Sequence, residues 1–209
     1  MSIDTVASRI HWLGHDAFRI DGPVTIYFDP YKISGGPPAD LVLISHEHYD
    51  HCSPEDLEKI AGPETIIVTV RSCLTKLSGQ TKVVTPGDSL TVKGIPIEVV
   101  PAYNVDKAFH PKVNRWLGFI VEIDGVKIYH AGDTDLIPEM GEIQTDIALL
   151  PVSGTYVMTA EEAAEAALTI NPALAIPMHY GTLVGDAADA ERFKQLLEGK
   201  VPVRIMKKE

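Results

Sequence analysis

The sequence predicts an α/β protein in which two similar halves each contain a sheet, the sheets pack face to face, and helices lie outside. Short apolar runs rich in β-branched residues, which are typical of buried strands, alternate with helix starts along the chain. In each half, one such run leads into a turn that carries histidine, and a helix follows. No low-complexity segment, charge block or linker interrupts residues 1–209, so we expect a single domain.

The N-terminal half is expected to consist mainly of strands. Gly14 lies near the turn of a predicted hairpin, and Asp29-Pro30 ends the next apolar run. Ser53 can cap a helix whose first position is Pro54. The elements expected here are a hairpin over 10–20, strands over 24–28, 41–44 and 65–70, and helices over 53–60 and 72–77.

The C-terminal half begins with apolar residues at a period of two over 82–103. Asp124-Gly125 is a strong hairpin signal, and Thr159-Ala160-Glu161-Glu162 is a capping box that opens an alanine-rich helix. Asp186 is the cap expected for the last helix. The further elements expected are strands over 117–123, 126–130, 147–150, 173–177 and 201–205, and helices over 160–168 and 187–198.

The composition is that of an ordinary soluble globular protein. The chain has 45% hydrophobic and 22% charged residues, and no apolar run approaches membrane-spanning length. We expect no signal peptide, and two cysteines provide no disulfide framework, so a cytoplasmic location is the default expectation. A formal net charge of −11 disfavours a large nucleic-acid interface, although a local positive pocket is compatible with it.

One seven-residue stretch, Ser45-His46-Glu47-His48-Tyr49-Asp50-His51, carries three imidazoles and two carboxylates. It lies on the turn between the strand predicted over 41–44 and the following helix. His46 and His48 are two apart in extended chain, so they face the same side and can bind one metal ion. Asp50 and His51 lie past the turn and can reach a second ion. This pattern predicts a metal site.

Further ligands must come from elsewhere in the chain, and three candidates stand at strand ends or in loops. Asp133 follows the strand predicted over 126–130, His179 follows the strand over 173–177, and His110 lies in a loop. His130 is an alternative to His110, because it lies on the strand that leads to Asp133. Otherwise it packs or forms a hydrogen bond behind the ligands.

Other residues near these motifs are expected to have lesser roles. His11 and His15 are interpreted as strand or turn residues without a metal role. Cys52 is interpreted as a small packed residue, with a ligand or reactive thiol as the alternative. Asp29 can either accept a hydrogen bond from a ligand imidazole or cap the turn before Pro30.

The combination of His46-x-His48-x-Asp50-His51, a later histidine, Gly132-Asp133-Thr134 and a final histidine resembles the metallo-β-lactamase superfamily. The short chain and its Met178-His179-Tyr180-Gly181 segment look most like the small metal-dependent hydrolases, the branch that contains ascorbate-6-phosphate lactonase-like proteins. The resemblance covers nearly the whole chain. It implies an αββα four-layer sandwich with a dinuclear site at one edge of the sheets.

The resemblance also implies a role for each ligand. Metal one would be held by His46, His48 and His110, and metal two by Asp50, His51 and His179, with Asp133 bridging both. Two divalent ions can share a hydroxide that attacks a carbonyl carbon or a phosphorus atom, and Asp50 can orient it or take its proton. Zinc is the expected metal, but manganese, iron and nickel also accept these ligands.

The substrate leaves fainter signals. Lys107, Lys112 and Arg115 surround His110 and are expected to attract a small anionic substrate, unless they form a solvated loop. Ser153, in Ser153-Gly154-Thr155-Tyr156, is expected to hold the substrate or an oxyanion. Tyr180 can do likewise, although a packed tyrosine is the favoured interpretation.

The function expected from the sequence is a metal-dependent hydrolase of a small anionic ester, lactone or phosphodiester. The alternatives are a nuclease or RNA phosphodiesterase, for which no basic arm is visible, and a non-catalytic or di-iron redox protein. No membrane partner is expected, and a homo-oligomer is compatible with the sequence.

Overall fold

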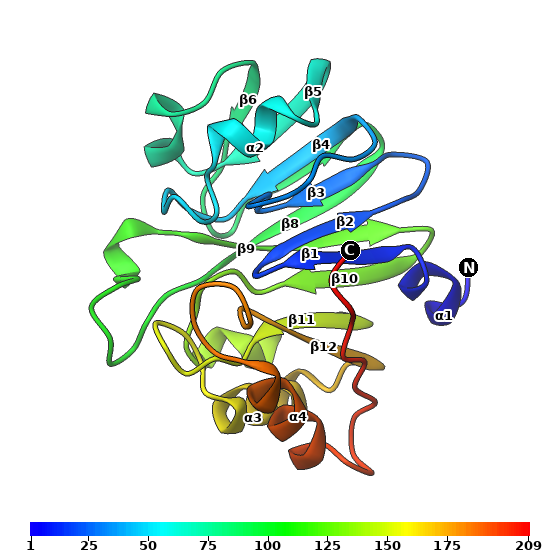
Figure 1. Ribbon diagram of the computed structural model, residues 1–209, viewed down its shortest axis with the longest axis vertical. Coiled ribbons are helices and arrows are strands. Elements are labelled where there is room, and N and C mark those ends of the chain that lie inside the picture. Colours follow the sequence, from blue (N-terminus) through cyan, green and yellow to red (C-terminus); the bar gives the residue numbers. More distant parts are fainter.

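A computed structural model describes all 209 residues as two six-stranded mixed sheets with helices on their outer faces (Figure 1). The first sheet has the order β1-β2-β3-β4-β5-β6 and the second the order β12-β11-β10-β9-β8-β7, so each half of the chain builds one sheet. The predicted sandwich of two sheets is therefore confirmed.

The first sheet begins with antiparallel strands and continues with parallel ones. β1 to β3 are antiparallel neighbours, whereas β3, β4, β5 and β6 run parallel. Parallel neighbours require crossover connections, and α2 and the 3₁₀ helix η1 lie in two of them. Its elements are α1 (Ile3–Ala7), β1 (Ile10–Gly14), β2 (Ala17–Ile20), β3 (Ile26–Phe28), β4 (Ala39–Ile44), α2 (Pro54–Glu58), β5 (Ala61–Thr69), η1 (Arg71–Thr75) and β6 (Gln80–Val83).

The second sheet follows the same plan. β7 to β10 are antiparallel neighbours, and β11 and β12 continue the sheet in parallel. Its elements are β7 (Ser89–Val92), β8 (Ile95–Pro101), η2 (Lys112–Asn114), β9 (Leu117–Ile123), β10 (Val126–His130), η3 (Pro138–Glu142), β11 (Ile147–Pro151), α3 (Ala160–Ile170), β12 (Leu174–Met178) and α4 (Ala187–Leu196).

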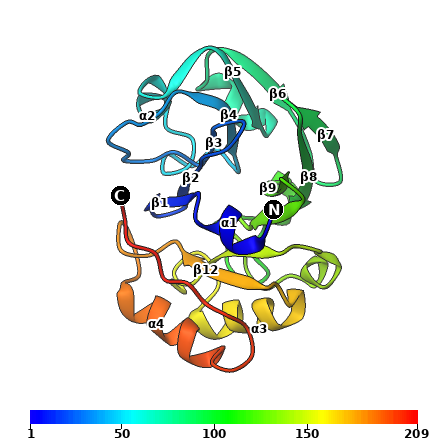
Figure 2. The same cartoon turned by 90° about the vertical axis from the view of Figure 1, so that its right-hand side faces the viewer.

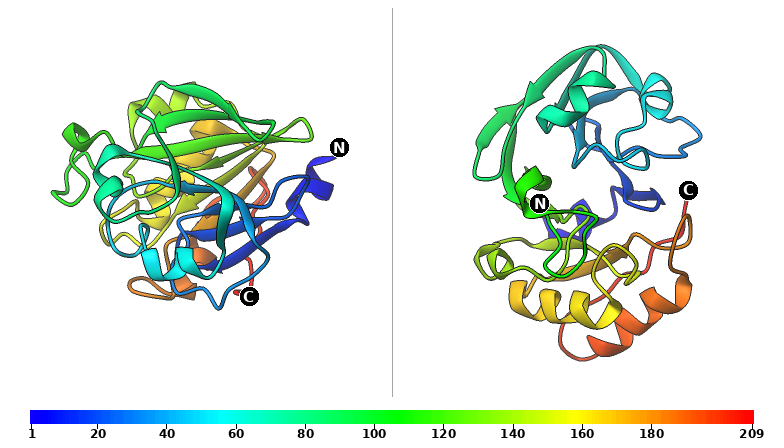
Figure 3. Two further views of the ribbon diagram at one scale, coloured as in Figure 1. Left: turned by 90° about the horizontal axis from the view of Figure 1, so that it is seen from above. Right: turned by 90° about the vertical axis from the view of Figure 1, so that its left-hand side faces the viewer.

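The two sheets share one core. A single cluster of 65 buried apolar residues includes side chains from both, among them Phe18 and Phe28 of the first sheet and Phe119 of the second. α3 and α4 pack on the outer side of the second sheet, at the opposite end of the molecule from α2 (Figures 2 and 3). None of the helices has the length and apolar character needed to span a lipid bilayer.

The chain ends differ from the prediction. The strand expected over 201–205 is absent, because Val203 forms only an isolated bridge with Ala175 and Pro202 has no N–H to donate to a ladder. The tail then crosses to the first sheet, where Lys208 bridges to Trp12 (Figure 1). The short helix α1 was not expected; Ser2 caps it by accepting a hydrogen bond from the N–H of Thr5.

Candidate metal centre

The turn between β4 and α2 carries four candidate ligands at the end of a strand whose last four residues, 41–44, are buried. After β4, the N–H groups of His51 and Cys52 both donate to the carbonyl of His48, at 3.1 and 2.8 Å. This tight turn places His46 and His48 in one cluster of imidazoles and His51 in another. The motif recognised in the sequence therefore serves two adjacent positions.

The first cluster consists of His46, His48 and His110, whose ligand atoms lie within 4.8 Å of one another. His110 comes from the loop after β8, and its backbone N–H donates to the side-chain oxygen of Asn104 at 2.9 Å. The indole of Trp116 packs against His46 and His48, with ring centroids 4.7 and 4.8 Å away. These three imidazoles are the ones expected for metal one.

The second cluster lies beside the first and contains His51, His179, Asp133 and Asp16, again within 4.8 Å. His179 directly follows β12 in a left-handed conformation with φ of 60°, and its N–H donates to the carbonyl of His15. Asp50 adjoins this cluster, because its Oδ2 lies 3.8 Å from Nε2 of His51.

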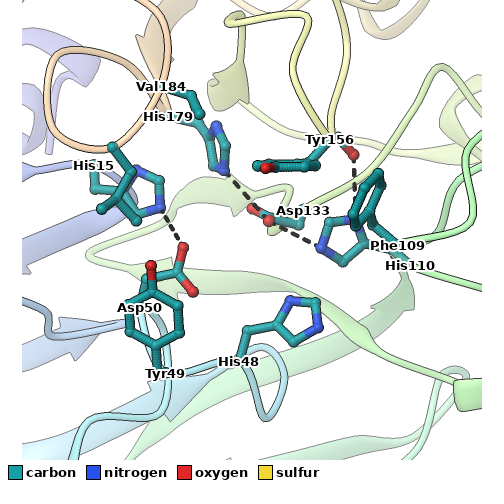
Figure 4. Close-up of a pocket in the computed structure, with 11 residues that line it drawn as sticks. His15, His48, Tyr49, Asp50, Phe109, His110, Asp133, Tyr156, His179 and Val184 are labelled. Atoms are coloured by element: carbon teal, nitrogen blue, oxygen red, sulfur yellow. Dashed lines mark hydrogen bonds and ion pairs between the residues drawn. The ribbon is translucent and has the colours of Figure 1, made fainter.

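Asp133 faces both clusters (Figure 4). Its Oδ2 lies 3.1 Å from Nε2 of His110 and 3.3 Å from Nε2 of His179, and its Oδ1 lies 3.4 Å from Nε2 of His51. Gly132, the residue before Asp133, allows the backbone path that places Asp133 between the clusters. Its φ is +63°, and a Cβ there would lie only 2.6 Å from the carbonyl oxygen of Leu117.

Four of the histidines have their Nδ1 atoms next to hydrogen-bond acceptors. These contacts are His46 to Ser45 Oγ at 2.9 Å, His51 to Asp29 Oδ2 at 2.8 Å, His110 to Asn104 Oδ1 at 3.0 Å and His179 to Ser153 Oγ at 2.9 Å. Each acceptor favours the tautomer protonated on Nδ1, which leaves the lone pair of Nε2 available to a metal.

Asp29 combines the two roles considered for it. Its Oδ1 accepts the backbone N–H of Ser45 at 2.7 Å, which ties down the turn after β4. Its Oδ2 accepts both the Ser45 hydroxyl and His51 Nδ1. One carboxylate thus orients His51 directly and His46 through Ser45.

The residues fit a metal. The Nε2 atoms of His51, His110 and His179 and the Oδ1 of Asp133 are buried and have no hydrogen-bond partner. Buried polar atoms are normally paired, so this convergence of lone pairs calls for a ligand. Imidazole nitrogens with carboxylate oxygens are a donor set that zinc and other divalent transition metals accept.

Electrostatics in the centre also favour cation binding. Burial lowers the pKa of His46, and neighbouring His51 lowers it further, so His46 is neutral at neutral pH. Burial works against ionisation of Asp133, but His179 and His51 hold its pKa well below the usual range. Burial also acts to lower the pKa of His51, but Asp133 and Asp29 outweigh it and raise that pKa well above normal. A cation at His51 must therefore displace a proton, and its binding weakens as the pH falls.

His15 is a site residue that the sequence analysis missed. Its backbone is in the β1–β2 turn, as expected, but its ring lies 4.2 Å from that of His179, and its Nε2 lies 3.0 Å from Oδ2 of Asp50. It also forms a possible ligand group with His51 and His179, where no metal role was expected. Burial lowers the pKa of His15 to about 4. The available signal was Gly14-His15, a tight hairpin turn at the same edge as the other histidine turns.

Asp16, next to His15, was also missed. Its carboxylate is completely buried, and neither oxygen has a hydrogen-bond partner. Burial, reinforced by Asp133, raises its pKa well above the usual range. Asp16 is therefore a member of the second cluster that holds its proton more tightly than an ordinary aspartate.

His130 does not join the centre. It is buried, stacks on Phe28 with a centroid distance of 4.9 Å, and its Nε2 lies 2.9 Å from the carbonyl of Asp16. The structure thus places His110 beside His46 and His48 and leaves His130, the alternative to His110, in the core. Cys52 is likewise buried as a free thiol.

The three cationic residues expected to bind substrate lie outside the cavity over the metal centre. Lys107 Nζ lies 2.7 Å from Asp135 Oδ1, and Lys112 Nζ lies 2.8 Å from Glu139 Oε1. Arg115 lines a separate groove with Lys112. The charges of both lysines are thus partnered by carboxylates.

Ser153 contacts His179, and Tyr180 follows His179 in the chain, but neither lines the cavity. Ser153 Oγ donates to the carbonyl of Thr155 and accepts from Nδ1 of His179. Tyr180 is buried and stacks on Trp12 at a centroid distance of 4.7 Å, and it does not line the cavity. Both expected substrate contacts therefore lie next to a ligand rather than at the cavity surface.

Comparison with known proteins identifies this arrangement. Residues 9–179, a range that includes every candidate histidine and aspartate ligand, match the family described as the beta-lactamase superfamily domain. The chain belongs to the metallo-β-lactamase superfamily. The cluster of histidine and aspartate side chains therefore lies in a protein whose superfamily includes metal-dependent hydrolases.

Curated relatives of this superfamily member are similar along almost their whole length. A UPF0173 metal-dependent hydrolase from Thermococcus onnurineus is 34% identical over 95% of this chain and 96% of its own. One from Thermoplasma acidophilum is 36% identical over 90% of both chains. The protein is therefore a member of the metal-dependent hydrolase family.

Solved structures show the same fold. A metal-dependent hydrolase from Parabacteroides distasonis has a TM-score of 0.86 at 33% identity, covering 96% of this chain and 93% of its own. Igni18, a metallo hydrolase from Ignicoccus hospitalis, has a TM-score of 0.78 at 29% identity, covering 95% and 94%. A di-iron β-hydroxylase from Streptomyces venezuelae, CmlA, has a TM-score of 0.76, covering 94% of this chain and 52% of its own, but at 13% identity it shares only the fold.

Proposed function

We propose that this metal-dependent hydrolase has a dinuclear centre and cleaves a small ester, lactone or phosphodiester. His46, His48 and His110 would hold one ion, Asp50, His51 and His179 the other, and Asp133 both. The observation that carries this proposal is the position of Asp133, whose two oxygens lie within 3.4 Å of Nε2 atoms from both clusters. Zinc suits this imidazole-rich set best, and manganese, iron or nickel also fit.

When bound, a pair of divalent ions would supply Lewis-acid activation of a carbonyl or phosphoryl group and of water. The protein's own residues provide orientation and proton acceptance. Burial acts to raise the pKa of Asp50, but the hydrogen bond from His15 and the nearby His51 lower it to about 2. Asp50 is therefore a carboxylate at neutral pH, able to accept a hydrogen bond or a proton from an attacking water.

Two other expectations find less support. Polynucleotide cleavage needs a basic surface that follows the phosphates, but the chain has a net charge of −11 and no lysine or arginine lines the cavity. A degenerate binding module would not need the complete donor set with its hydrogen-bonded Nδ1 atoms. Both observations favour catalysis on a small molecule.

Metal analysis of the purified protein, followed by hydrolysis assays on the same preparation, tests this function. We expect two divalent ions per chain at saturation, and turnover of bis(4-nitrophenyl) phosphate or dihydrocoumarin that a chelator abolishes and added metal restores. One ion per chain at saturation would reject the dinuclear centre. If the protein bound two ions but hydrolysed neither bis(4-nitrophenyl) phosphate nor dihydrocoumarin, nor the lactam nitrocefin, the proposed substrates would be rejected.

A further inference from the structure

The cavity over the metal centre has two chemically different parts. Its floor is made by the metal-centre side chains, including His48, His110 and Asp133, and its rim by five apolar or aromatic residues. The rim residues are Tyr49, Phe109, Tyr156, Leu183 and Val184. The cavity volume of about 360 Å³ is near the lower end of the range for small-molecule sites, about 300–1,000 Å³.

The rim concentrates exposed apolar surface at one place. Tyr49 is 64% exposed, Phe109 54%, Tyr156 40% and Leu183 37%, and these are four of the ten large apolar side chains exposed in the molecule. Exposed apolar residues scattered singly require no explanation, but a cluster around a polar centre marks a binding site.

The aromatic part of the rim is held in place by the metal centre itself. Phe109 and Tyr156 meet edge to face with a centroid distance of 4.4 Å (Figure 4). Phe109 directly precedes His110, and the carbonyl of Tyr156 lies 3.2 Å from Nδ1 of that ligand. The same carbonyl accepts a hydrogen bond from Asn104 Nδ2 at 2.8 Å. A group bound between these rings would therefore meet a wall that is already ordered.

No side-chain cation is available at this rim to bind a negative charge on the substrate in addition to that of its reacting group. No lysine or arginine lines the cavity, and Lys107 and Lys112, the nearest cations in sequence to Phe109, are paired with Asp135 and Glu139. Beyond the reacting group, recognition must come from apolar contact and from the aromatic ring faces and edges.

Building on the hydrolase function proposed above, we propose that the substrate carries an uncharged aryl group, or a similarly flat apolar group, next to its scissile bond. This group lies against Phe109, Tyr156 and Leu183 while the carbonyl or phosphoryl group faces Asp133. The site thereby discriminates against substrates with a second anionic group. This differs from the anionic recognition expected from Lys107 and Lys112.

Three carboxylates with one common head group test the proposal on zinc-loaded protein. Phenylacetate, acetate and succinate all present a carboxylate to the centre, but they end in an aryl ring, a methyl group and a second charge. From the apolar area that a phenyl ring buries, we expect phenylacetate to bind at least about tenfold more tightly than either of the others, measured by ligand-observed NMR titration. Succinate binding as tightly as phenylacetate would overturn the proposal.

A pair of variants assigns the effect to the rim. Phe109→Ser should reduce the advantage of phenylacetate over acetate to less than about threefold, because it removes one wall of the aryl site. Val113→Ser is the matched control: Val113 lies four residues further along the chain in η2, is 83% exposed and does not line the cavity. It should leave the advantage unchanged. If Phe109→Ser and Val113→Ser changed the advantage of phenylacetate over acetate equally, the assignment of the effect to the rim would be contradicted.

A further probe separates this proposal from the hydrolase function on which it rests. 4-Nitrobenzyl alcohol has no carboxylate, so its binding should persist in metal-free protein and weaken severalfold in Phe109→Ser. If the protein proved not to be a hydrolase, this binding would still be found. If turnover were found but neither aromatic probe depended on Phe109, the hydrolase would stand and the aryl site would be rejected.

Discussion

The two halves of the molecule contribute to the metal centre in different ways. The N-terminal half supplies four candidate ligands from one turn after β4, within His46 to His51. The C-terminal half supplies three, one each from separate connections: His110 after β8, Asp133 after β10 and His179 after β12. The first set is positioned by local backbone geometry, whereas the second depends on the order of strands in the second sheet. The predictions below begin with the residue that joins the two sets, and the comparison of Asp29 with Ser153 tests this difference directly.

The largest effect is expected at the residue that joins the two clusters. Asp133→Asn should reduce binding of both ions and lower kcat/KM by at least about a thousandfold, since the amide keeps only one oxygen, carries no negative charge and cannot serve both positions as a carboxylate can. His110→Gln should reduce binding at one position only. Metal content and circular dichroism of both variants check this. An Asp133→Asn protein that keeps two ions at wild-type affinity contradicts the bridging position.

Removing a hydrogen-bond partner of a candidate ligand should reduce metal affinity by a smaller factor, and this factor should differ between the two halves. Asp29→Asn weakens the support of both His51 and His46, so we expect metal affinity to fall by about a hundredfold. Ser153→Ala removes the acceptor of His179 alone and should cost about tenfold. Competition with a chromogenic chelator measures both affinities. Equal losses in the two variants would mean that the halves depend on their supports to the same extent.

His15 provides a test within the N-terminal half but outside the ligand turn. His15→Phe keeps an aromatic ring beside His179 and removes the hydrogen bond to Asp50. We expect kcat to fall about tenfold while two ions remain bound, because His15 orients the proton acceptor. His15→Gln, which retains a donor, should recover part of this loss. Loss of an ion from His15→Phe would instead make His15 a ligand.

The smallest effect is expected on stability, away from the metals. Asp56 is buried and accepts hydrogen bonds from the N–H groups of Lys32 and Ile33 and from Lys59 Nζ. Burial acts to raise its pKa, but the hydrogen bonds from Lys59 and Ser53 outweigh burial and lower it. A lowered pKa stabilises the fold above the unfolded-state value of about 4, and this contribution is lost as the pH falls through the folded-state pKa.

Asp56→Asn should therefore lower the free energy of unfolding by about 1–2 kcal/mol at pH 7 and by less at about pH 3. Urea denaturation at the two pH values measures the difference. Asp106→Asn is a suitable control, because Asp106 also pairs with a lysine but its side chain is 74% exposed. If the loss of unfolding free energy in Asp56→Asn grew as the pH fell, the lowered pKa of Asp56 would be contradicted.

Several local patterns predicted the structure well. The hairpin through Asp124-Gly125 and the helix after Thr159 form as expected, because turn geometry and capping depend on neighbouring residues. The strand expected over 201–205 fails because a strand requires a partner, and Val203 finds only one bridge. The carboxylate partners of Lys107 and Lys112 were not predicted for a similar reason: Asp135 and Glu139 are more than twenty residues away in sequence.

The sequence alone predicted a metal-binding turn at the end of a strand, because the spacing of His46, His48, Asp50 and His51 depends only on the local path of the backbone. It also identified Asp133 and His179 through their positions at strand ends. Three features became visible only in the folded structure: His110 rather than His130 lies beside His46 and His48, His15 and Asp16 lie with the second cluster, and an apolar rim surrounds the cavity. Those outcomes depend on which strand ends and loops lie side by side in space, and short-range patterns carry no information about such distances.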